Sequence, residues 1–244
     1  MSEWSSRYGA GHELPTVCIL AGGLGSRLGS HVKDTPKPLL TVAGTPFLLH
    51  QLRLLSNFGA SKAVVCVGYL GDRIEETIGD EQFGIQLVYS YDSPGLDGTL
   101  GAIRRAAPLL GRRFLVMYGD TYLRLDYRDF DRRWRASSQP GGMTVLLNEG
   151  RWDRSNVLYG KERVLKYDKV SPTADMKWID YGLGGLTSEV LAVVPAGERD
   201  LSVLYSALAE RGELFGFEAK ERFYEIGTPT GFSETDEFLR SLGE

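Results

Sequence analysis

A glycine-rich segment that directly follows an apolar run is the feature that most constrains the fold of this chain. Residues 16–21 have the short, apolar and partly β-branched character of a buried strand, and Gly22, Gly23 and Gly25 come next. Because glycine has no side chain, backbone amides in such a segment can approach a phosphate closely. The segment therefore predicts an anion site at the end of a strand, although a tight connecting turn would use the same glycines.

Strand-like and helix-like runs alternate through the first half of the chain. Strands are expected at residues 16–21, 63–68, 85–91 and 114–118, and helices at 45–58, 72–78 and 99–110. For the first helix, Thr45 is the expected N-cap, Pro46 the first helical residue and Gly59 the residue past the end. This alternation predicts an α/β fold of three layers, with a mostly parallel sheet and helices on both of its faces.

The pattern changes after residue 120 to shorter polar and apolar alternations. The elements expected there are helices at 127–136, 201–210 and 229–242 and strands at 143–147, 214–217 and 223–226. We expect a single domain over residues 16–244, with one half at about 16–125 and a smaller one at about 126–244. Residues 1–15 are mostly polar and are expected to form a flexible extension.

The overall charge and hydropathy pattern exclude several classes of protein. A formal net charge of −4 and a pI near 5.5 argue against a surface that follows nucleic-acid phosphates, which needs clustered Lys and Arg. No apolar run approaches the roughly 20 residues needed to cross a bilayer, and the first residues lack the order of a signal peptide. We therefore expect a cytoplasmic protein without nucleic-acid or membrane partners.

The cysteines and histidines give no support for a zinc site. Cys18 and Cys66 each lie inside an apolar run, where free cysteine behaves as a small hydrophobic residue. Neither a CxxC pair nor an HExxH spacing occurs in the sequence. Any metal is therefore expected to be held by oxygen ligands.

Two cations follow the glycines and suit a phosphate site. Arg27 comes directly after them, and Lys37 stands between Pro36 and Pro38. The prolines restrict the backbone around the lysine, so its ammonium is presented from a stiffened segment. Arg offers a planar fork for phosphate oxygens and Lys a compact point charge, which predicts a phosphate clamp. Two solvated surface cations are the alternative.

Two other phosphate-binding patterns fail at this segment. A dinucleotide fingerprint starting at Gly23 would need its third glycine where Leu28 stands. A Walker loop needs Gly-Lys followed by Ser or Thr, whereas the Gly-Lys pair of this chain precedes Glu162, far from the glycine segment. A nicotinamide dehydrogenase is therefore a lesser alternative, and a P-loop protein is excluded.

Asp120 follows the strand expected at 114–118, at the edge where open α/β sheets bind ligands. Its carboxylate is the kind of oxygen ligand that Mg²⁺ prefers, together with water and substrate phosphates. An aspartate that caps a local turn is the competing interpretation.

Four stretches of the sequence together resemble the sugar-1-phosphate nucleotidyltransferases: LAGGLGSRL, PKPLLTVAGTPFL, YGD and EIGTP. The resemblance extends from Val17 to about Phe232, with the motifs in the order of the family. It implies a Rossmann-like nucleotide half followed by a sugar-binding half. It also implies the reaction of an NTP with a sugar 1-phosphate, which gives an NDP-sugar and pyrophosphate with the help of Mg²⁺.

The resemblance also assigns roles to individual positions. It implies that the nucleotide is bound by Leu20, Ala21, Gly22, Gly23, Gly25, Gly98 and Thr99. It places catalysis on Arg27, Lys37, Asp120 and Glu225, of which Asp120 and Glu225 would be the metal ligands. The sugar phosphate would be bound by Lys169, Asp180, Tyr181 and Gly182.

The sequence departs from the family pattern at two of these places. Glu225 stands where many relatives have Asp; it carries the same charge on a longer arm, and its alternative role is bonding to local amides. Asp180, Tyr181 and Gly182 stand where the family usually has Asn-Ala-Gly, so an unusual sugar is expected.

The base, the sugar and the assembly stay open at this stage. The glycine loop leans by resemblance toward GTP and a mannose- or heptose-type sugar, with UTP, CTP or dTTP as alternatives. A regulator that binds nucleotide without catalysis is an alternative of another class, favoured by Glu225. The protein is expected to be a monomer or a homodimer.

Overall fold

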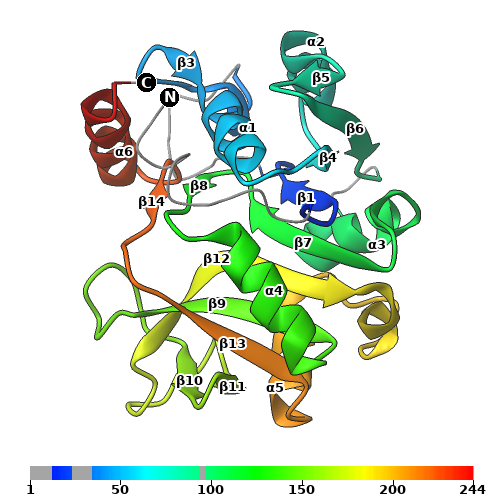
Figure 1. Ribbon diagram of the computed structural model, residues 1–244, viewed down its shortest axis with the longest axis vertical. Helices are drawn as coiled ribbons and strands as arrows, with labels where there is room; N and C mark the ends of the chain where they lie inside the picture. Colours follow the sequence, from blue (N-terminus) through cyan, green and yellow to red (C-terminus); the bar gives the residue numbers. More distant parts are fainter. Residues whose placement is uncertain (1–12, 24–34, 94–96, 244) are drawn as a thin grey trace.

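A single large sheet organises the computed structural model, which describes residues 13–23, 35–93 and 97–243 (Figure 1). Within these residues the sheet has ten strands. Their spatial order is β10 (Val157–Gly160), β11 (Arg163–Tyr167), β13 (Leu214–Ala219), β9 (Gly141–Leu147), β12 (Trp178–Thr187), β7 (Arg113–Tyr118), β1 (Val17–Leu20), β4 (Lys62–Val67), β6 (Ile85–Tyr91) and β5 (Glu81–Gln82).

The parallel part of this sheet lies where the alternation of strands and helices predicts it. Strands β7, β1, β4 and β6 are parallel neighbours, and β13 is parallel to β9. In contrast, β12 is antiparallel to both β7 and β9, and β10, β11 and β5 also pair antiparallel. The Rossmann-like α/β fold is confirmed, and the sheet as a whole is mixed because the second half contributes most of the antiparallel pairs.

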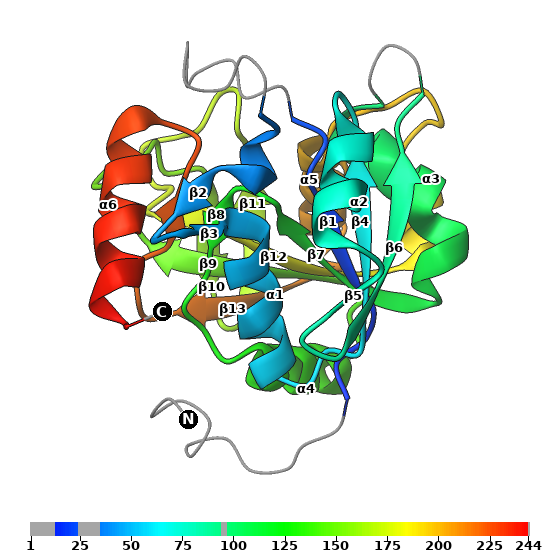
Figure 2. The ribbon, with the colours of Figure 1, turned by 90° about the horizontal axis from the view of Figure 1, so that it is seen from above.

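Helices cover both faces of the sheet and complete the three layers (Figures 1 and 2). One face packs against α1 (Phe47–Asn57), α2 (Gly71–Ile78) and α4 (Tyr127–Ser137), and the other against α3 (Gly98–Leu110) and α5 (Leu201–Glu210). Successive side chains of a strand point to opposite faces, so Val17 and Ile19 join one core and Cys18 joins the other. The apolar runs seen in the sequence are therefore strands that are buried on both sides.

The start of α1 differs from the sequence-based expectation. Thr45–Pro46 form strand β3, which pairs with β2 (Thr41–Val42), and the helix begins at Phe47 with Pro46 as its N-cap. The amide of Phe47 donates to the carbonyl of Leu40 at 3.0 Å, so the preceding turn satisfies the first helical amide and Thr45 is not needed as a cap. Other boundaries agree closely, and β6 and α5 have the predicted bounds.

A small third cluster joins the last helix to the rest of the fold. Helix α6 (Pro229–Ser241) has Thr228 as its N-cap, and the side chain of this residue accepts a hydrogen bond from the amide of Gly231. The helix packs beside β2, and its Leu239 is buried with Tyr122 and other residues (Figure 2). Just before α6, β14 (Tyr224–Glu225) pairs antiparallel with β8 (Thr121–Tyr122). Two short 3-10 helices, η2 (Lys37–Leu39) and η3 (Ser188–Ala192), complete the described elements.

The predicted N-terminal extension of residues 1–15 lies mostly outside the described residues. Within the described part, Leu14 is already buried, and its amide donates to the carbonyl of Gly59 at 3.3 Å. Among the helices that the structure describes, none has both the length and the apolar character needed to span a bilayer.

Two glycines allow the sheet to lie directly against a tryptophan. Gly142 of β9 and Gly185 of β12 are register partners, and both face the completely buried ring of Trp134 on α4. A Cβ atom on Gly185 would stand 2.5 Å from Trp134 Cε3, and one on Gly142 would stand 2.9 Å from Cδ1. The two strands therefore have no room for a methyl group on this face.

Replacement of Gly185 by alanine is expected to lower the free energy of unfolding by about 1–3 kcal/mol, because the added methyl forces the indole or the strand to move. Denaturant unfolding followed by tryptophan fluorescence measures this change. Gly197→Ala is the matched control, since open space surrounds the position of its Cβ. Equal stability of the two variants would contradict the packing argument.

Candidate active site

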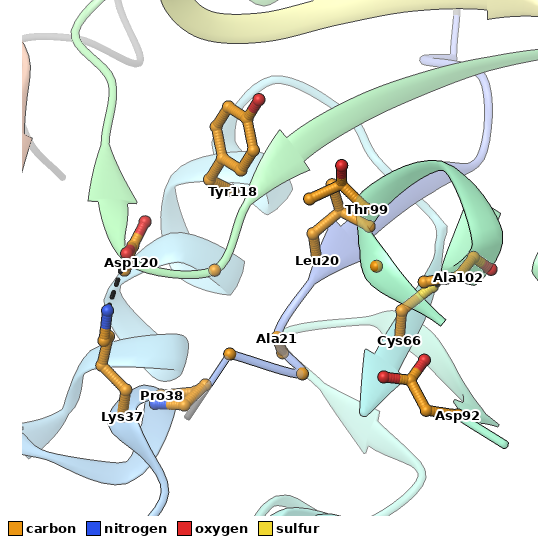
Figure 3. Close-up of a pocket in the computed structure, with 14 residues that line it drawn as sticks. Leu20, Ala21, Lys37, Pro38, Cys66, Asp92, Thr99, Ala102, Tyr118 and Asp120 are labelled. Carbon is orange, nitrogen blue, oxygen red and sulfur yellow. Dashed lines mark hydrogen bonds and ion pairs between the residues drawn. The ribbon is translucent and has the colours of Figure 1, made fainter. Parts of the chain in front are cut away.

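A cavity of about 240 Å³ lies at the carboxyl ends of the parallel strands (Figure 3). Residues at the ends of β1, β4 and β7, the residue after β6 and the first turn of α3 all contribute to its wall, which is the edge where open α/β sheets bind ligands. Eight predicted site residues line it: Leu20, Ala21, Gly22, Gly23, Lys37, Gly98, Thr99 and Asp120. Gly25 and Arg27 lie outside the described residues, so their roles stay predictions.

An ion pair closes one end of the cavity. Lys37 Nζ lies 3.0 Å from Asp120 Oδ2, with only 10% of the lysine side chain and 30% of the aspartate side chain exposed (Figure 3). Lys37 begins η2, with Pro36 as N-cap and the buried Pro38 next to it, as the stiffened segment of the sequence predicts. The other carboxylate oxygen of Asp120 accepts from the hydroxyl of Thr121 at 3.1 Å. The ammonium of Lys37 and the carboxylate of Asp120 are therefore held in contact beside the glycines.

The structure brings Glu225 to the same place, although it is far from Asp120 in the sequence. The amide of Ile226 donates to the carbonyl of Asp120 at 2.9 Å, and Glu225 is the register partner of Thr121. A Cβ atom on Gly227 would lie 2.8 Å from Glu225 Oε2, 3.5 Å from Asp120 Oδ2 and 3.6 Å from Lys37 Nζ. Two carboxylates and one ammonium thus converge on the space that the missing side chain of Gly227 leaves.

The carboxylate of Glu225 also accepts hydrogen bonds from the residues that precede α6. Its Oε2 accepts from the amides of Gly227 and Thr228, the latter at 3.1 Å, and its Oε1 accepts from the hydroxyl of Thr228 at 2.6 Å. The local role considered for this glutamate is therefore present in the structure. It does not exclude a metal, because an ionised carboxylate has about four lone-pair sites and three are used.

The donor set fits Mg²⁺. Over residues 13–23, 35–93 and 97–243, no three Asp, Glu, His or Cys side chains gather into a complete metal cage. Mg²⁺ usually takes one or two carboxylates from the protein and fills its remaining positions with water and substrate phosphates. Asp120 and Glu225 match that requirement, and their role as ligands stays a prediction.

A buried glutamine holds the turn that carries Asp120. The amide nitrogen of Gln51, on α1, donates to the carbonyl of Tyr118 at 2.9 Å and to that of Thr121 at 2.8 Å. Gln51 is completely buried, and its two bonds fix the backbone on both sides of Asp120. No motif assigns a role to Gln51, although a polar side chain on the apolar face of the 45–58 helix is a visible signal in the sequence.

The first turn of α3 also contacts the second half of the chain. The hydroxyl of Thr99 accepts from the amide of Leu201 at 2.9 Å, and the amide of Leu100 donates to the carbonyl of Arg199 at 2.8 Å. Thr99 therefore fixes the start of α5 while it lines the cavity. A nucleotide at this turn would lie directly beside the second half.

Asp180 and Lys169 lie next to the cavity, across Tyr118. Lys169 Nζ is 5.6 Å from the centroid of the Tyr118 ring, and Asp180 accepts from the hydroxyl of Tyr167 at 3.1 Å and from the amide of Gly182 at 3.0 Å. Burial raises the pKa of Asp180, while the charge of Lys169 and the two hydrogen bonds oppose the rise. This cluster therefore lies beside the cavity wall at Tyr118.

Tyr181 is not part of that cluster. Only 1% of its surface is exposed, and its hydroxyl accepts from the amide of Arg124 at 3.0 Å while it faces the carbonyls of Arg124 and Arg222. Consecutive residues of a strand point to opposite faces, so Asp180 and Tyr181 cannot serve the same surface. This placement in the core corrects the prediction that the phenol faces a sugar.

The cavity wall also includes residues without a predicted role. Cys66 is 99% buried in the manner expected of a core cysteine, with its sulfur 3.5 Å from that of Cys18, yet it borders the cavity. Asp92, which directly follows β6, was not singled out either. An acidic residue at a strand end shortly before the Gly98 segment was the available signal.

Comparison with known proteins agrees with this geometry. The model of the family described as "Nucleotidyl transferase" matches residues 16–160. The chain belongs to this family. The resemblance drawn from its sequence motifs is thereby confirmed.

The relatives include enzymes named for guanylyl transfer. The chain is 27% identical over 222 residues to the mannose-1-phosphate guanylyltransferase catalytic subunit beta of Drosophila pseudoobscura, covering 88% of this chain and 59% of that protein. It is 37% identical over 108 residues to the D-glycero-α-D-manno-heptose 1-phosphate guanylyltransferase of Campylobacter jejuni, covering 44% and 48%. The chain thus spans less than two thirds of the length of these curated relatives.

A solved structure shows the same fold with a nucleotide analogue. HddC from Yersinia pseudotuberculosis, complexed with GMP-PN, superimposes with a TM-score of 0.77 at 25% identity, covering 93% of this chain and 100% of that one. The two proteins therefore share the arrangement of the sheet and its helices along nearly the whole chain.

Replacement of Gln51 by leucine is expected to lower the free energy of unfolding by about 1–3 kcal/mol, because two buried carbonyls lose their donor. Denaturant unfolding measures the loss. Gln86→Leu on the exposed side of β6 is the control. A Gln51 variant as stable as that control would show that the turn around Asp120 does not depend on the glutamine.

Proposed function

We propose that this protein is a Mg²⁺-dependent nucleotidyltransferase that converts an NTP and a sugar 1-phosphate into an NDP-sugar and pyrophosphate. The observation that supports this most directly is the meeting of Lys37, Asp120 and Glu225 at one end of a glycine-lined cavity. Family membership and relatives named guanylyltransferases favour GTP with a mannose- or heptose-type sugar. A cytoplasmic monomer or homodimer is the form proposed for the enzyme.

In the proposed reaction, an oxygen of the sugar phosphate attacks the α-phosphorus of the NTP. A new bond forms between this oxygen and the α-phosphorus, on the side opposite the leaving group. The bond between the α-phosphorus and the oxygen that bridges to the β-phosphorus breaks, and pyrophosphate leaves with the electron pair of that bond. No protein nucleophile is required, so the residues mainly position the substrates and neutralise charge. Mg²⁺ held by Asp120 and Glu225 would supply charge neutralisation and orientation of phosphate oxygens.

Different residues of the chain would position the substrates and neutralise their charge. The backbone at Gly22 and Gly23 is accessible to phosphate oxygens, and the ammonium of Lys37 is presented beside it with little freedom to move. Lys37 would neutralise negative charge that develops near the α-phosphorus. Lys169 and Asp180, across Tyr118, would hold the phosphate and a hydroxyl of the sugar in the half from about residue 126 onward.

Asp120→Asn is expected to lower turnover by roughly 100-fold or more, because it removes the charge of a metal ligand while keeping the size of the side chain. Pyrophosphate release with each NTP, Mg²⁺ and a panel of sugar 1-phosphates measures this effect. Asp175→Asn, at an exposed position, is the control. Nucleotide binding without pyrophosphate release by the unaltered protein would instead indicate the non-catalytic regulator.

Lys37→Ala is expected to reduce kcat by a larger factor than it raises the KM for the nucleotide, because its charge matters most in the transition state. Steady-state kinetics at saturating sugar phosphate separates the two parameters, with the exposed Lys161→Ala as control. An unchanged kcat with a raised KM would assign Lys37 to ground-state binding only.

A further inference from the structure

Gly231 lies in the first turn of α6, where glycine weakens a helix relative to alanine because it loses more conformational freedom on folding. It is not among the glycines with a positive φ, so its backbone has a conformation that any residue can adopt. That backbone is also fixed, since its amide donates to the hydroxyl of Thr228 at 3.0 Å and its carbonyl accepts from the hydroxyl of Thr235 at 2.7 Å. The reason for a glycine here therefore lies in the space that its missing side chain leaves.

The carboxylate of Glu225 fills that space. A Cβ atom on Gly231 would collide with Oε1 and Cδ of Glu225, and it would stand 2.8 Å from the backbone carbonyl oxygen of the same residue. Gly227 leaves a second space next to Oε2. The carboxylate thus rests against two glycines, and the space at Gly227 is the one that it shares with Asp120 and Lys37.

Hydrogen bonds at the start of α6 hold the carboxylate in this place. The amides of Gly227 and Thr228 donate to Oε2, and the hydroxyl of Thr228 donates to Oε1 at 2.6 Å. The hydroxyl of Thr235 donates to the backbone carbonyl of Glu225 at 2.8 Å, so the main chain of the glutamate is attached to the same helix. A methyl group at position 231 would therefore meet a carboxylate that cannot move aside without losing hydrogen bonds.

The length of the Glu225 side chain explains why room is needed here. Glu225 is a position at which the sequence departs from aspartate, and the extra methylene carries its carboxylate farther from the strand. Its backbone is fixed in β14 as the register partner of Thr121, and β14 leads directly into α6 (Figure 1). The longer side chain must therefore be accommodated against the first turn of the helix, where Gly231 provides the room.

We propose that Gly231 is a positioning residue for the cation site, because its missing side chain forms the seat of the Glu225 carboxylate. The glutamate and the glycine thus act as a pair, and a side chain at position 231 suits only a shorter acid at position 225. Position 231 lies beyond the EIGTP motif, and the family resemblance assigns no role to it. The part that concerns a cation rests on the proposed function, whereas the seat is a property of the metal-free protein.

A double-mutant cycle on the metal-free protein tests the seat. Gly231→Ala is expected to lower the denaturant midpoint of unfolding, although Gly→Ala at a position with helical backbone ordinarily raises stability. In a Glu225→Asp background the carboxylate ends one methylene nearer the strand, so the same substitution is expected to lower the midpoint less or to raise it. The close approach to the backbone carbonyl of residue 225 is common to both backgrounds and cancels in the cycle.

Thr230→Ala is the matched control, because it introduces alanine in the same helical turn at an exposed position. Its effect on the midpoint is expected to be equal in the two backgrounds. An equal fall for Gly231→Ala in both backgrounds would show that the methyl group conflicts with the main chain alone, and it would overturn the seat.

Binding of Mn²⁺ to the protein without nucleotide, measured by electron paramagnetic resonance, tests the positioning role. Residues that orient a metal ligand typically change metal affinity by 10–100-fold, so Gly231→Ala is expected to raise the Kd for Mn²⁺ by roughly 10-fold or more. The variant that combines Glu225→Asp with Gly231→Ala is expected to bind Mn²⁺ more tightly than Gly231→Ala alone. Thr230→Ala is expected to keep the Kd of the unaltered protein. A merely structural role of Gly231 would not produce this rescue.

The outcomes separate this proposal from the proposed function. An unchanged Mn²⁺ affinity of Gly231→Ala, or the absence of rescue in the combined variant, overturns the positioning role of Gly231. Failure of the unaltered protein to bind Mn²⁺ overturns the role of Glu225 as a metal ligand together with it. Mn²⁺ binding and coupling as expected, without pyrophosphate release from any NTP, overturn nucleotidyl transfer instead and leave the pair of Glu225 and Gly231 intact.

Discussion

The pairing of β8 with β14 is the contact on which the candidate site depends. It joins Thr121 to Glu225 and places the backbone of Ile226 on the carbonyl of Asp120, although the two segments are separated by most of the second half of the chain. Only two residue pairs form this ladder, so its position is fixed by its surroundings. Those surroundings are the glutamine of α1 beneath the Asp120 turn and the packing of α6 beside Tyr122.

The sheet places the cavity and the proposed sugar side next to each other. The parallel strands β1, β4, β6 and β7 end at the cavity proposed for the nucleotide, and β12 continues the same sheet with the proposed sugar side next to Tyr118. The bond between Thr99 and the start of α5 joins the two sides once more at the cavity rim. Positioning by rigid elements of this kind is the main requirement of a transfer that needs no protein nucleophile.

Local patterns predicted the helices and the parallel strands, because the physics of each element is itself local, but they did not predict β10, β11 or β12. The bounds of β6 and α5 and the glycine cavity follow from hydrophobic periodicity and from residues that end or begin elements. Thr45 was misassigned because a tertiary hydrogen bond at Phe47 replaced the expected side-chain cap. Tyr181 was misassigned because a motif does not show which face of a strand each residue occupies.

The site residues that the sequence did not reveal are those whose role is defined by distant neighbours. Gln51 matters because α1 passes beneath the Asp120 turn, and Asp92 because β6 ends at the cavity. Neither circumstance can be deduced from spacing along the chain. In contrast, Lys37 and Asp120 belong to short motifs whose residue types already suit phosphate and metal, so the sequence indicated them before their 3.0 Å contact was known.

The attachment of Glu225 to the first turn of α6 has a mechanical consequence. The amides of Gly227 and Thr228, which directly precede α6, donate to the carboxylate of Glu225. A tilt or a small outward shift of α6 would therefore move Glu225 with it. Asp120, whose turn is held by Gln51 of α1, would stay behind. The separation of the two acidic groups thus depends on how firmly α6 packs against the rest of the fold, and a change at the surface of α6 can alter the proposed cation site.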